Sequence, residues 1–363
     1  MTTLCSPATL EPMPSSHAEP AASVRLHAPG RLHLGFLDPA GSLGRAFGSL
    51  GLVIEGFETV VELSAAPADG ASAETPAARA DIDRACAHLH EMRRRTGRHE
   101  PLHLRLLRAL PAHAGFGSGT QLALAVGRAF AAWHGLDLDS VTLAGWLHRG
   151  ARSGIGIAGF DQGGLLVDGG PGLDGAPAPL LSRIALPEAW RIVVAQDQSQ
   201  AGLFGPEEKQ AIAGLAPLPR AKAADICHQV MMRVLPGASC DEFEAFAAGV
   251  THIQDVLGEH FAPAQGGRAY TSAAVGQLVQ WIGEASCSWG RGAQAPARHG
   301  AAIGQSSWGP TGFAILPSQA QAESLVQAAR QAGLVAPGLA VSVVRGRNAG
   351  AVLMDSRAAR PTR

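Results

Sequence analysis

The feature that most limits how this chain folds is a glycine-rich segment at residues 111–121, which reads PAHAGFGSGTQ. It follows an alternating run at 102–107, typical of a half-buried strand, and it leads into a run with helical spacing at 119–130. Alternating glycines let successive backbone N–H groups point into one concavity, and the start of a helix directs its unsatisfied N–H groups to the same place. The segment therefore predicts either a pyrophosphate-sized anion site or a tight strand-to-helix turn without a ligand.

Composition excludes several classes of protein. The 363 residues predict two domains, and a hydrophobic content of 46% is enough for a sizeable core. The 29 basic and 30 acidic residues leave a formal net charge of −1, which argues against binding to nucleic acid or an anionic membrane. Five scattered cysteines without a Cys-x-x-Cys pair indicate reduced thiols. With no signal peptide and no long apolar run, the sequence predicts a cytoplasmic protein.

The order of elements favours an α+β fold over a doubly wound sheet. We predict a disordered tail at 1–22, a first domain at 23–200, a second at 201–356 and a second tail at 357–363. Helices are predicted at 81–95, 119–130, 141–149, 221–234, 240–257, 273–285 and 319–331. Strands are predicted at 24–28, 32–37, 52–54, 59–63, 102–107, 165–167, 184–186, 192–194, 313–316, 341–345 and 351–354.

Two further segments lie towards the two ends of the chain. Residues 28–38 read APGRLHLGFLD, and residues 303–313 read IGQSSWGPTGF. With the glycine-rich segment between them, they resemble the three motifs of the GHMP kinase superfamily, and the resemblance covers about residues 24–356. The residues of these motifs are most similar to those of a non-kinase branch, the β-ribofuranosylaminobenzene 5'-phosphate synthases. The phrases that carry this likeness lie at 30–34, 115–127, 152–156, 164–170 and 304–311.

The resemblance implies a GHMP-type two-domain fold, with an N-terminal half like ribosomal protein S5 domain 2 and a ferredoxin-like C-terminal half. It implies a phosphoribosyltransferase that joins phosphoribosyl pyrophosphate to 4-aminobenzoate or 4-hydroxybenzoate and releases CO2 and pyrophosphate. The product, β-ribofuranosylaminobenzene 5'-phosphate in the first case, belongs to methanopterin biosynthesis. The family also suggests Mg2+ as cofactor and a homodimer.

The resemblance also implies roles for individual residues. Pyrophosphate is assigned to the glycine-rich loop, namely to Gly115, Gly117, Ser118, Gly119 and Thr120. Ser118 and Asp161 are expected to be catalytic. Asp161 lies where many GHMP kinases carry their catalytic aspartate; it is expected to bind Mg2+ or stabilise positive charge, or else to cap a turn.

Other candidates are chosen for the anionic and aromatic groups of the substrates. A guanidinium matches phosphate and carboxylate bidentately, which suggests Arg31, Arg45 and Arg152. His33 alternates with two leucines and so points away from the core face, as a ligand contact or a plain strand histidine. The remaining candidates are Ser306, Ser307 and Trp308, of which Trp308 either stacks on an aromatic substrate or only packs.

Two rival functions remain open on sequence. One is a GHMP small-molecule kinase, and the other is a non-catalytic nucleotide-binding protein. GHMP kinases usually read Gly-Leu-Gly-Ser-Ser-Ala in the loop and carry a lysine in the first motif, whereas this chain has Gly119-Thr-Gln and Arg31. The chain has only two lysines, Lys209 and Lys222, and neither is near a motif. ADP release would indicate the kinase, and CO2 release that depends on phosphoribosyl pyrophosphate would indicate the synthase.

Overall fold

Two long antiparallel strands, β1 (Ser23–Asp38) and β2 (Phe47–Ala65), form the central hairpin of the structure. The computed structural model describes residues 22–202, 205–288 and 300–357, so nearly all of both predicted tails lies outside the described residues. The separate short strands predicted at 24–37 and 52–63 are continuous here. β-Bulges between Pro29 and Arg31 and between His33 and Gly35 keep β1 continuous through its irregular residues.

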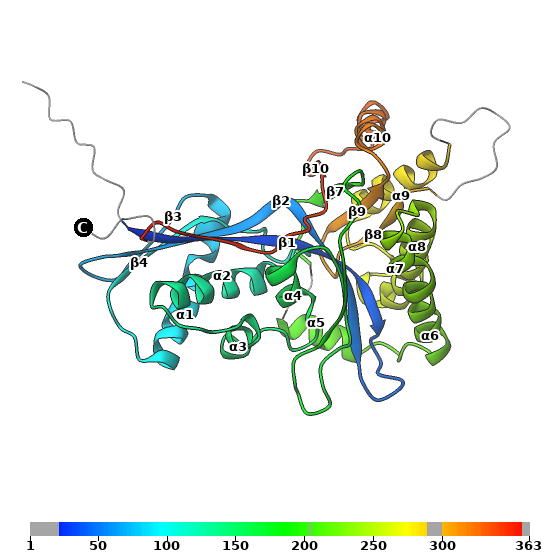
Figure 1. Ribbon diagram of the computed structural model, residues 1–363. Coiled ribbons are helices and arrows are strands. Elements are labelled where there is room, and N and C mark those ends of the chain that lie inside the picture. Colours follow the sequence, from blue (N-terminus) through cyan, green and yellow to red (C-terminus); the bar gives the residue numbers. More distant parts are fainter. Residues whose placement is uncertain (1–21, 203–204, 289–299, 358–363) are drawn as a thin grey trace, which may run out of the picture.

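A seven-stranded sheet is built on this hairpin (Figure 1). Its order is β11–β1–β2–β4–β3. β5 pairs with the N-terminal part of β2, at Ser49–Leu52, and also with β6. The bounds are β3 (Gly70–Ala73), β4 (Leu102–Arg108), β5 (Leu165–Asp168), β6 (Leu180–Ile184) and β11 (Val352–Asp355).

Four helices pack along this sheet and with one another: α1 (Pro76–Thr96), α2 (Ser118–Trp133), α3 (Ser140–Trp146) and α4 (Ile155–Gln162). α2 lies in the middle and is buried on nearly every face, which explains its long run of apolar and small residues. Gly127 brings it close to α3, since a Cβ there would lie 3.1 Å from Leu147. This part of α2 thereby packs closely against the end of α3.

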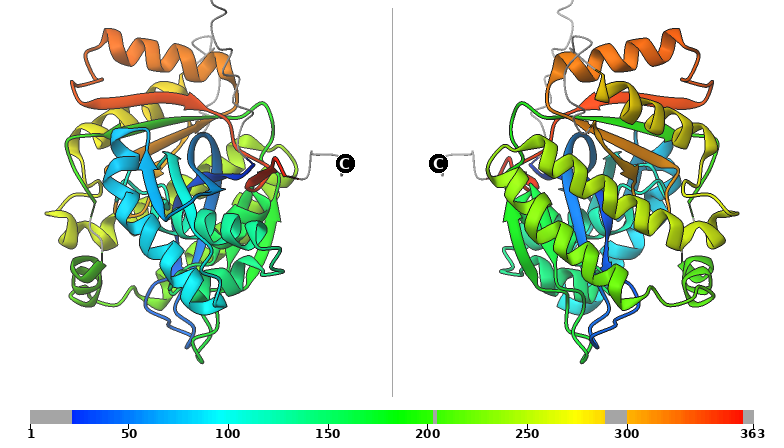
Figure 2. Two further views of the ribbon diagram at one scale, coloured as in Figure 1. Left: turned by 90° about the vertical axis from the view of Figure 1, so that its left-hand side faces the viewer. Right: turned by 90° about the vertical axis from the view of Figure 1, so that its right-hand side faces the viewer.

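The second sheet has the order β10–β7–β9–β8 and is antiparallel throughout. Its bounds are β7 (Arg191–Asp197), β8 (Ala302–Gln305), β9 (Thr311–Leu316) and β10 (Leu339–Val344). Alternate residues of β7 face different cores: Ile192 belongs to the cluster around α8, and Val193 to the cluster with α9 and α10. α9 (Ala273–Cys287) and α10 (Gln319–Gln331) cover this second face, with α10 outermost (Figure 2).

The remaining helical segments lie between β7 and β8 in the chain. They are α5 (Gly205–Ala213), α6 (Arg220–Gln229), a π-helical turn (Val230–Val234), α7 (Leu235–Ser239), α8 (Phe243–Phe261) and a 3-10 turn (Ala262–Gln265). α8 contacts both β1 and β8, so it joins the two sheets through one hydrophobic core. None of the helices in the described ranges combines the length and apolar character needed to cross a membrane.

The two sheets do not divide the chain at residue 200, where the sequence predicts a domain boundary. β7 precedes that position but pairs with β9 and β10, and β11 follows it but pairs with β1. Ser356 closes the first sheet by donating its backbone N–H to the carbonyl oxygen of Ser23 at 3.0 Å. Each sheet therefore takes a strand from the other half of the chain.

Candidate functional site

The glycine-rich loop between β4 and α2 adopts a conformation that only glycine takes readily. Gly115 and Gly117 have φ of 89° and 76°, in the left-handed region. A Cβ on Gly115 would lie 2.4 Å from the carbonyl oxygen of Ser306, so the loop also approaches the turn after β8 too closely for any side chain. The glycines therefore serve backbone geometry and close packing together.

Hydrogen bonds to this loop bring the three sequence motifs into one place. The carbonyl oxygen of Gly115 accepts from Arg31 Nη1 and from Ser306 Oγ, both at 2.7 Å. Ser306 Oγ in turn accepts from the backbone N–H of His33 at 2.9 Å. Ser306, which the sequence suggests as a substrate contact, is fully buried and clamps the three motifs to one another.

The start of α2 forms one wall of a cleft of about 560 Å³. The helix begins at Ser118, and its N-cap residue Gly117 supplies no side-chain cap. This end of the helix carries the positive end of its dipole. The N–H groups of Ser118 and Gly119 have no partner within the helix, whereas those of Thr120 and Gln121 donate to the carbonyl oxygen of Gly117. Ser118, Gly119 and Thr120 line the cleft beside them, so backbone donors and two hydroxyls converge on one anion-sized space.

Arginines surround this space on the other sides. The cleft is lined by Arg31, Arg84, Arg149 and Arg152, and no aspartate or glutamate of the described residues lines it. Arg84 is paired with Asp81 at 2.8 Å, on the preceding turn of α1. An excess of guanidinium groups around unsatisfied backbone donors is the arrangement that binds multiply charged phosphates.

Arg149 is the most informative of these residues, and the sequence analysis missed it. Its guanidinium has no hydrogen-bond or ion-pair partner in the part of the chain that the structure describes, and its Nε is buried. Burial, and then the nearby Arg84, lowers its pKa. It lies beside the loop, since a Cβ on Gly119 would be 3.4 Å from its Nη1. The basic residues between His148 and Arg152, at the end of a predicted helix, are the sequence signal that could have identified it.

His33 lies at the junction of the cleft and a smaller adjoining pocket, and it is only 4% exposed. Its Nδ1 accepts from the backbone N–H of Gly35 at 3.3 Å, so the neutral ring carries its proton on Nε2. Nε2 is buried and has no hydrogen-bond partner within the described ranges. Burial, and then Arg31 and Arg152, holds the pKa of His33 well below its usual range. The ring is therefore a neutral N–H donor at physiological pH.

Asp168 organises the far wall of the cleft from a fully buried position. Its carboxylate accepts from the backbone N–H groups of Gly154 and Ile155, at 2.8 and 3.2 Å, and from Ser153 Oγ at 3.0 Å. These bonds fix the start of α4, where Gly156 packs against Thr120. Asp168 thus caps the start of α4 from the neighbouring strand β5.

Two predicted site residues lie away from the cleft. Asp161, expected to act in catalysis or to bind Mg2+, is exposed at the far end of α4 and accepts from Ser140 Oγ at 2.5 Å. Ser140 also contacts Arg128, which is ten residues beyond Ser118 on α2 and so about 15 Å along that helix. Arg45 donates to the carbonyl oxygen of Gly170 at 2.9 Å and does not line the cleft. Neither residue lines this cleft, and the roles assigned to both stay predictions.

We expect Asp161→Asn to change kcat and KM by less than about threefold, because its carboxylate faces Ser140 and not the cleft. Its main effect should be on stability: loss of a charged acceptor of one hydrogen bond costs about 1 kcal/mol. Steady-state kinetics and thermal unfolding of the variant check both parts. A loss of activity of a hundredfold or more in a folded variant would support the catalytic role predicted from the sequence.

A second prediction concerns acid stability. Burial, and then Arg149 and Arg84, lowers the pKa of His88 to about 4. The unfolded chain takes up this proton near pH 6.5 but the folded chain only near pH 4, so the free energy of unfolding should fall as the pH drops through that window. One such group contributes up to about 1.4 kcal/mol per pH unit. His88→Gln should therefore flatten the decline, as measured by urea unfolding at pH 7, 6 and 5; an unchanged decline would contradict this assignment.

Comparison with known proteins adds to this geometry. Residues 82–166 match the family model for the GHMP kinases N terminal domain. The chain is 32% identical over 311 residues to the β-ribofuranosylphenol 5'-phosphate synthase of Archaeoglobus fulgidus, a match that covers 82% of this chain and 89% of that protein. It is also 32% identical over 245 residues to the protein of the same name from Methanothermobacter thermautotrophicus, covering 63% and 74% of the two chains.

Solved structures similar to this one include GHMP kinases. Homoserine kinase from Cytophaga hutchinsonii matches with a TM-score of 0.65 at 16% identity, covering 93% of this chain and 98% of that one. Galactokinase from Lactococcus lactis matches with a TM-score of 0.62 at 12% identity, covering 91% and 95%. At these identities the likeness shows the fold alone, and it confirms the predicted GHMP-type α+β fold.

Proposed function

The chain belongs to the β-ribofuranosylphenol 5'-phosphate synthase family, and on that basis we propose that it is a decarboxylating phosphoribosyltransferase. Its substrates would be phosphoribosyl pyrophosphate and 4-aminobenzoate or 4-hydroxybenzoate, in methanopterin biosynthesis. The observation that carries this proposal is the cleft, in which Arg149, without a counterion in the described chain, faces the start of α2. A highly anionic donor would supply a counterion for Arg149.

The glycine-rich loop suits the pyrophosphate arm of the donor. The unsatisfied N–H groups at the start of α2, the hydroxyls of Ser118 and Thr120 and the guanidinium of Arg149 all border the same space. Donors arranged in advance around a leaving pyrophosphate stabilise the charge that develops on it. This leaves Arg31 and Arg152, on the side of the cleft that holds His33, for the acceptor carboxylate or the 5'-phosphate.

The described residues of this site suit Mg2+ that arrives as part of the substrate. Within the described residues, no group of three or more histidine, cysteine, aspartate or glutamate side chains could hold a metal ion, and no carboxylate lines the cleft. Mg2+ takes oxygen ligands and is commonly bound through substrate phosphates together with one or two protein groups. We therefore propose that Mg2+ enters with the pyrophosphate and that Ser118 and Thr120 supply the nearest protein oxygens.

The reaction requires the protein to align its two substrates and does not require a strong base. As the bond between the ribosyl C1 and pyrophosphate breaks, the ring carbon that bears the carboxylate attacks C1. The bond from that carbon to the carboxylate then breaks, its electrons restore the aromatic ring, and CO2 leaves. Neutral His33 can donate its Nε2 proton in a hydrogen bond to an anionic group at the junction without losing it. Holding ring and ribose together supplies much of the rate.

Competition between donors tests the nature of the cleft. Phosphoribosyl pyrophosphate titrated with Mg2+ into the protein in a calorimeter should bind, and ATP should compete weakly or not at all. Adding each benzoate with ATP should yield no ADP. Tight ATP binding with ADP formation, and no binding of phosphoribosyl pyrophosphate, would instead support a small-molecule kinase, whose fold this chain shares.

A further inference from the structure

A second pocket adjoins the cleft and shares one wall with it. The two have four lining residues in common: His33, Phe36, Ser307 and Trp308. We call it the aromatic pocket; its other lining residues are Gly35, Gln254, Leu257, Gly258, Phe261, Gln265, Ala269 and Gln305. These come from β1, α8, the 3-10 turn, the loop after that turn, and β8, so the pocket lies where the two sheets meet α8.

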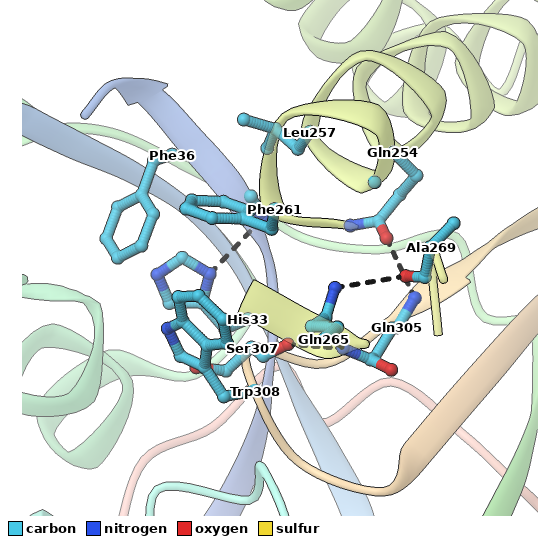
Figure 3. Close-up of a pocket in the computed structure, with 12 residues that line it drawn as sticks. His33, Phe36, Gln254, Leu257, Phe261, Gln265, Ala269, Gln305, Ser307 and Trp308 are labelled. Atoms are coloured by element: carbon cyan, nitrogen blue, oxygen red, sulfur yellow. Dashed lines mark hydrogen bonds between the residues drawn. The ribbon is translucent and has the colours of Figure 1, made fainter. Parts of the chain in front are cut away.

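Aromatic rings form the side of this pocket next to the cleft. Phe36 meets His33 edge to face with ring centroids 4.5 Å apart, and Phe261 packs on Trp308 at 4.9 Å. Trp308 takes its place because Ser307 has a φ of 57°, an uncommon value for a residue other than glycine. Such strain is kept where the surrounding structure holds it, often at a functional site. The rings of His33, Phe261 and Trp308 lie together in Figure 3.

Amide groups form the opposite side (Figure 3). The side chain of Gln305 is fixed by three hydrogen bonds: Nε2 donates to Gln265 Oε1 and to the carbonyl oxygen of Ser307, and Oε1 accepts from the backbone N–H of Thr271. A carbonyl oxygen has two lone pairs, so Gln305 Oε1 can accept once more. Gln265 Nε2 makes only long contacts, of 3.5 and 3.4 Å, to the carbonyl oxygens of Arg268 and Ala269. The pair therefore offers a ligand one acceptor, Gln305 Oε1, and one donor, Gln265 Nε2, whose present hydrogen bonds are long.

We propose that the aromatic pocket binds the benzoate acceptor, with the ring against Trp308 and Phe261 and the para substituent at Gln265 and Gln305. This rests on the proposed function. The carboxylate-bearing carbon then faces the cleft, where it bonds to C1 of the ribosyl group. Pyrophosphate leaves with the electrons of the C1–O bond, and the ring recovers the electrons of its bond to the departing CO2. The orientation follows because the aromatic side, and not the amide side, adjoins the arginines.

The loop after the 3-10 turn has to move outward when the ring enters. The pocket now encloses about 40 Å³, whereas a cavity that takes benzene has about 150 Å³. Gly266 and Gly267 in this loop are exposed, and a Cβ on either would touch nothing within 4 Å. Ala269, which lines the pocket, is exposed in the same loop. This wall is thus the least constrained side of the pocket.

The amide pair also sets how the para group is recognised. A hydroxyl can accept from Gln265 Nε2 and donate to Gln305 Oε1, whereas the nitrogen of an arylamine donates well but accepts poorly because its lone pair is delocalised into the ring. Removing the donor should therefore weaken 4-hydroxybenzoate more than 4-aminobenzoate. We expect Gln265→Met to shift the ratio of their kcat/KM values about tenfold towards the amine.

The test uses three variants of the full chain: Ala269→Leu, Gln265→Met and, as a matched control, Gln331→Met at the exposed end of α10. Ala269→Leu should raise KM for either benzoate at least tenfold and leave KM for phosphoribosyl pyrophosphate within twofold. Gln265→Met should shift the ratio of the kcat/KM values for 4-hydroxybenzoate and 4-aminobenzoate. General damage to the fold would not change this ratio. Gln331→Met should change neither.

Binding measured without turnover separates this proposal from the proposed function. Quenching of tryptophan fluorescence by each benzoate gives a dissociation constant even if no product forms, and Trp308→Phe identifies the quenched residue. If wild type turns over but Ala269→Leu and Gln265→Met leave unchanged the KM values for both benzoates and the ratio of their kcat/KM values, the pocket assignment is wrong and the function stands. If wild type releases no CO2 yet these variants weaken benzoate binding, the function is wrong and the pocket stands.

Discussion

Replacing Arg149 by methionine is expected to lower kcat/KM for phosphoribosyl pyrophosphate by about 10²–10³-fold with little loss of stability. The guanidinium is partly buried beside Gly119 and has no counterion in the described ranges. Its charge therefore stabilises an incoming anion rather than the fold, and burial strengthens that interaction. Removing a half-buried cation next to Arg84 should even relieve repulsion. Steady-state kinetics and thermal unfolding, measured together, check both halves of this expectation.

Arg330→Met is the matched control, because Arg330 is the same residue type in an exposed position on α10. It should leave kcat/KM within twofold. Arg149→Lys keeps the charge but not the planar, bidentate group, and should recover only part of the loss. Activity near that of wild type in Arg149→Met would mean that the cleft does not hold the pyrophosphate.

The second large effect is expected from the loop hydroxyls. The double variant Ser118→Ala/Thr120→Ala should lower kcat by about 10²–10³-fold, the usual loss when a well-placed donor to developing charge is removed. The backbone N–H groups at the start of α2 remain in this variant, so the KM for phosphoribosyl pyrophosphate should rise less than kcat falls. Rapid-quench measurement of pyrophosphate release separates the two quantities.

Thr120→Ser is the control for this pair, since it keeps the hydroxyl and removes only a methyl group. It should retain at least a third of the activity. Gly156 packs on Thr120 Cγ2, so the methyl group has a small packing role of its own. If the double variant were as active as Thr120→Ser, the backbone donors and arginines alone would account for the site.

The glycine-rich loop and its neighbours could be predicted from sequence because their constraints are local. Gly115 and Gly117 have positive φ, and the helical pattern begins directly after them. A helix that starts at this loop can therefore be predicted from the amino-acid sequence alone. The predicted helix at 319–331 and the strands at 165–167, 192–194 and 313–316 also lie within α10, β5, β7 and β9. The periodicity of apolar residues is enough to predict these elements without knowledge of their tertiary contacts.

The parts that sequence did not predict depend on contacts between distant segments. Short α4 has no amphipathic pattern of its own and starts where Asp168 caps it from a neighbouring strand. Asp161 lies at the end of α4 and outside the cleft, because a motif fixes position along the chain but not which end of a helix faces a cleft. Arg149 was missed because its lack of a partner among the described residues is visible only in the folded structure.

The central claim is that one cleft couples loss of pyrophosphate to decarboxylation of an aromatic acid. The most direct measurement follows CO2 from carboxyl-labelled 4-hydroxybenzoate or 4-aminobenzoate together with pyrophosphate, in the presence of phosphoribosyl pyrophosphate and Mg2+. We predict that the two are released one for one with at least one of the benzoates, and that release collapses in Ser118→Ala/Thr120→Ala. No CO2 from either benzoate, in a folded protein that forms ADP from ATP, would contradict the claim.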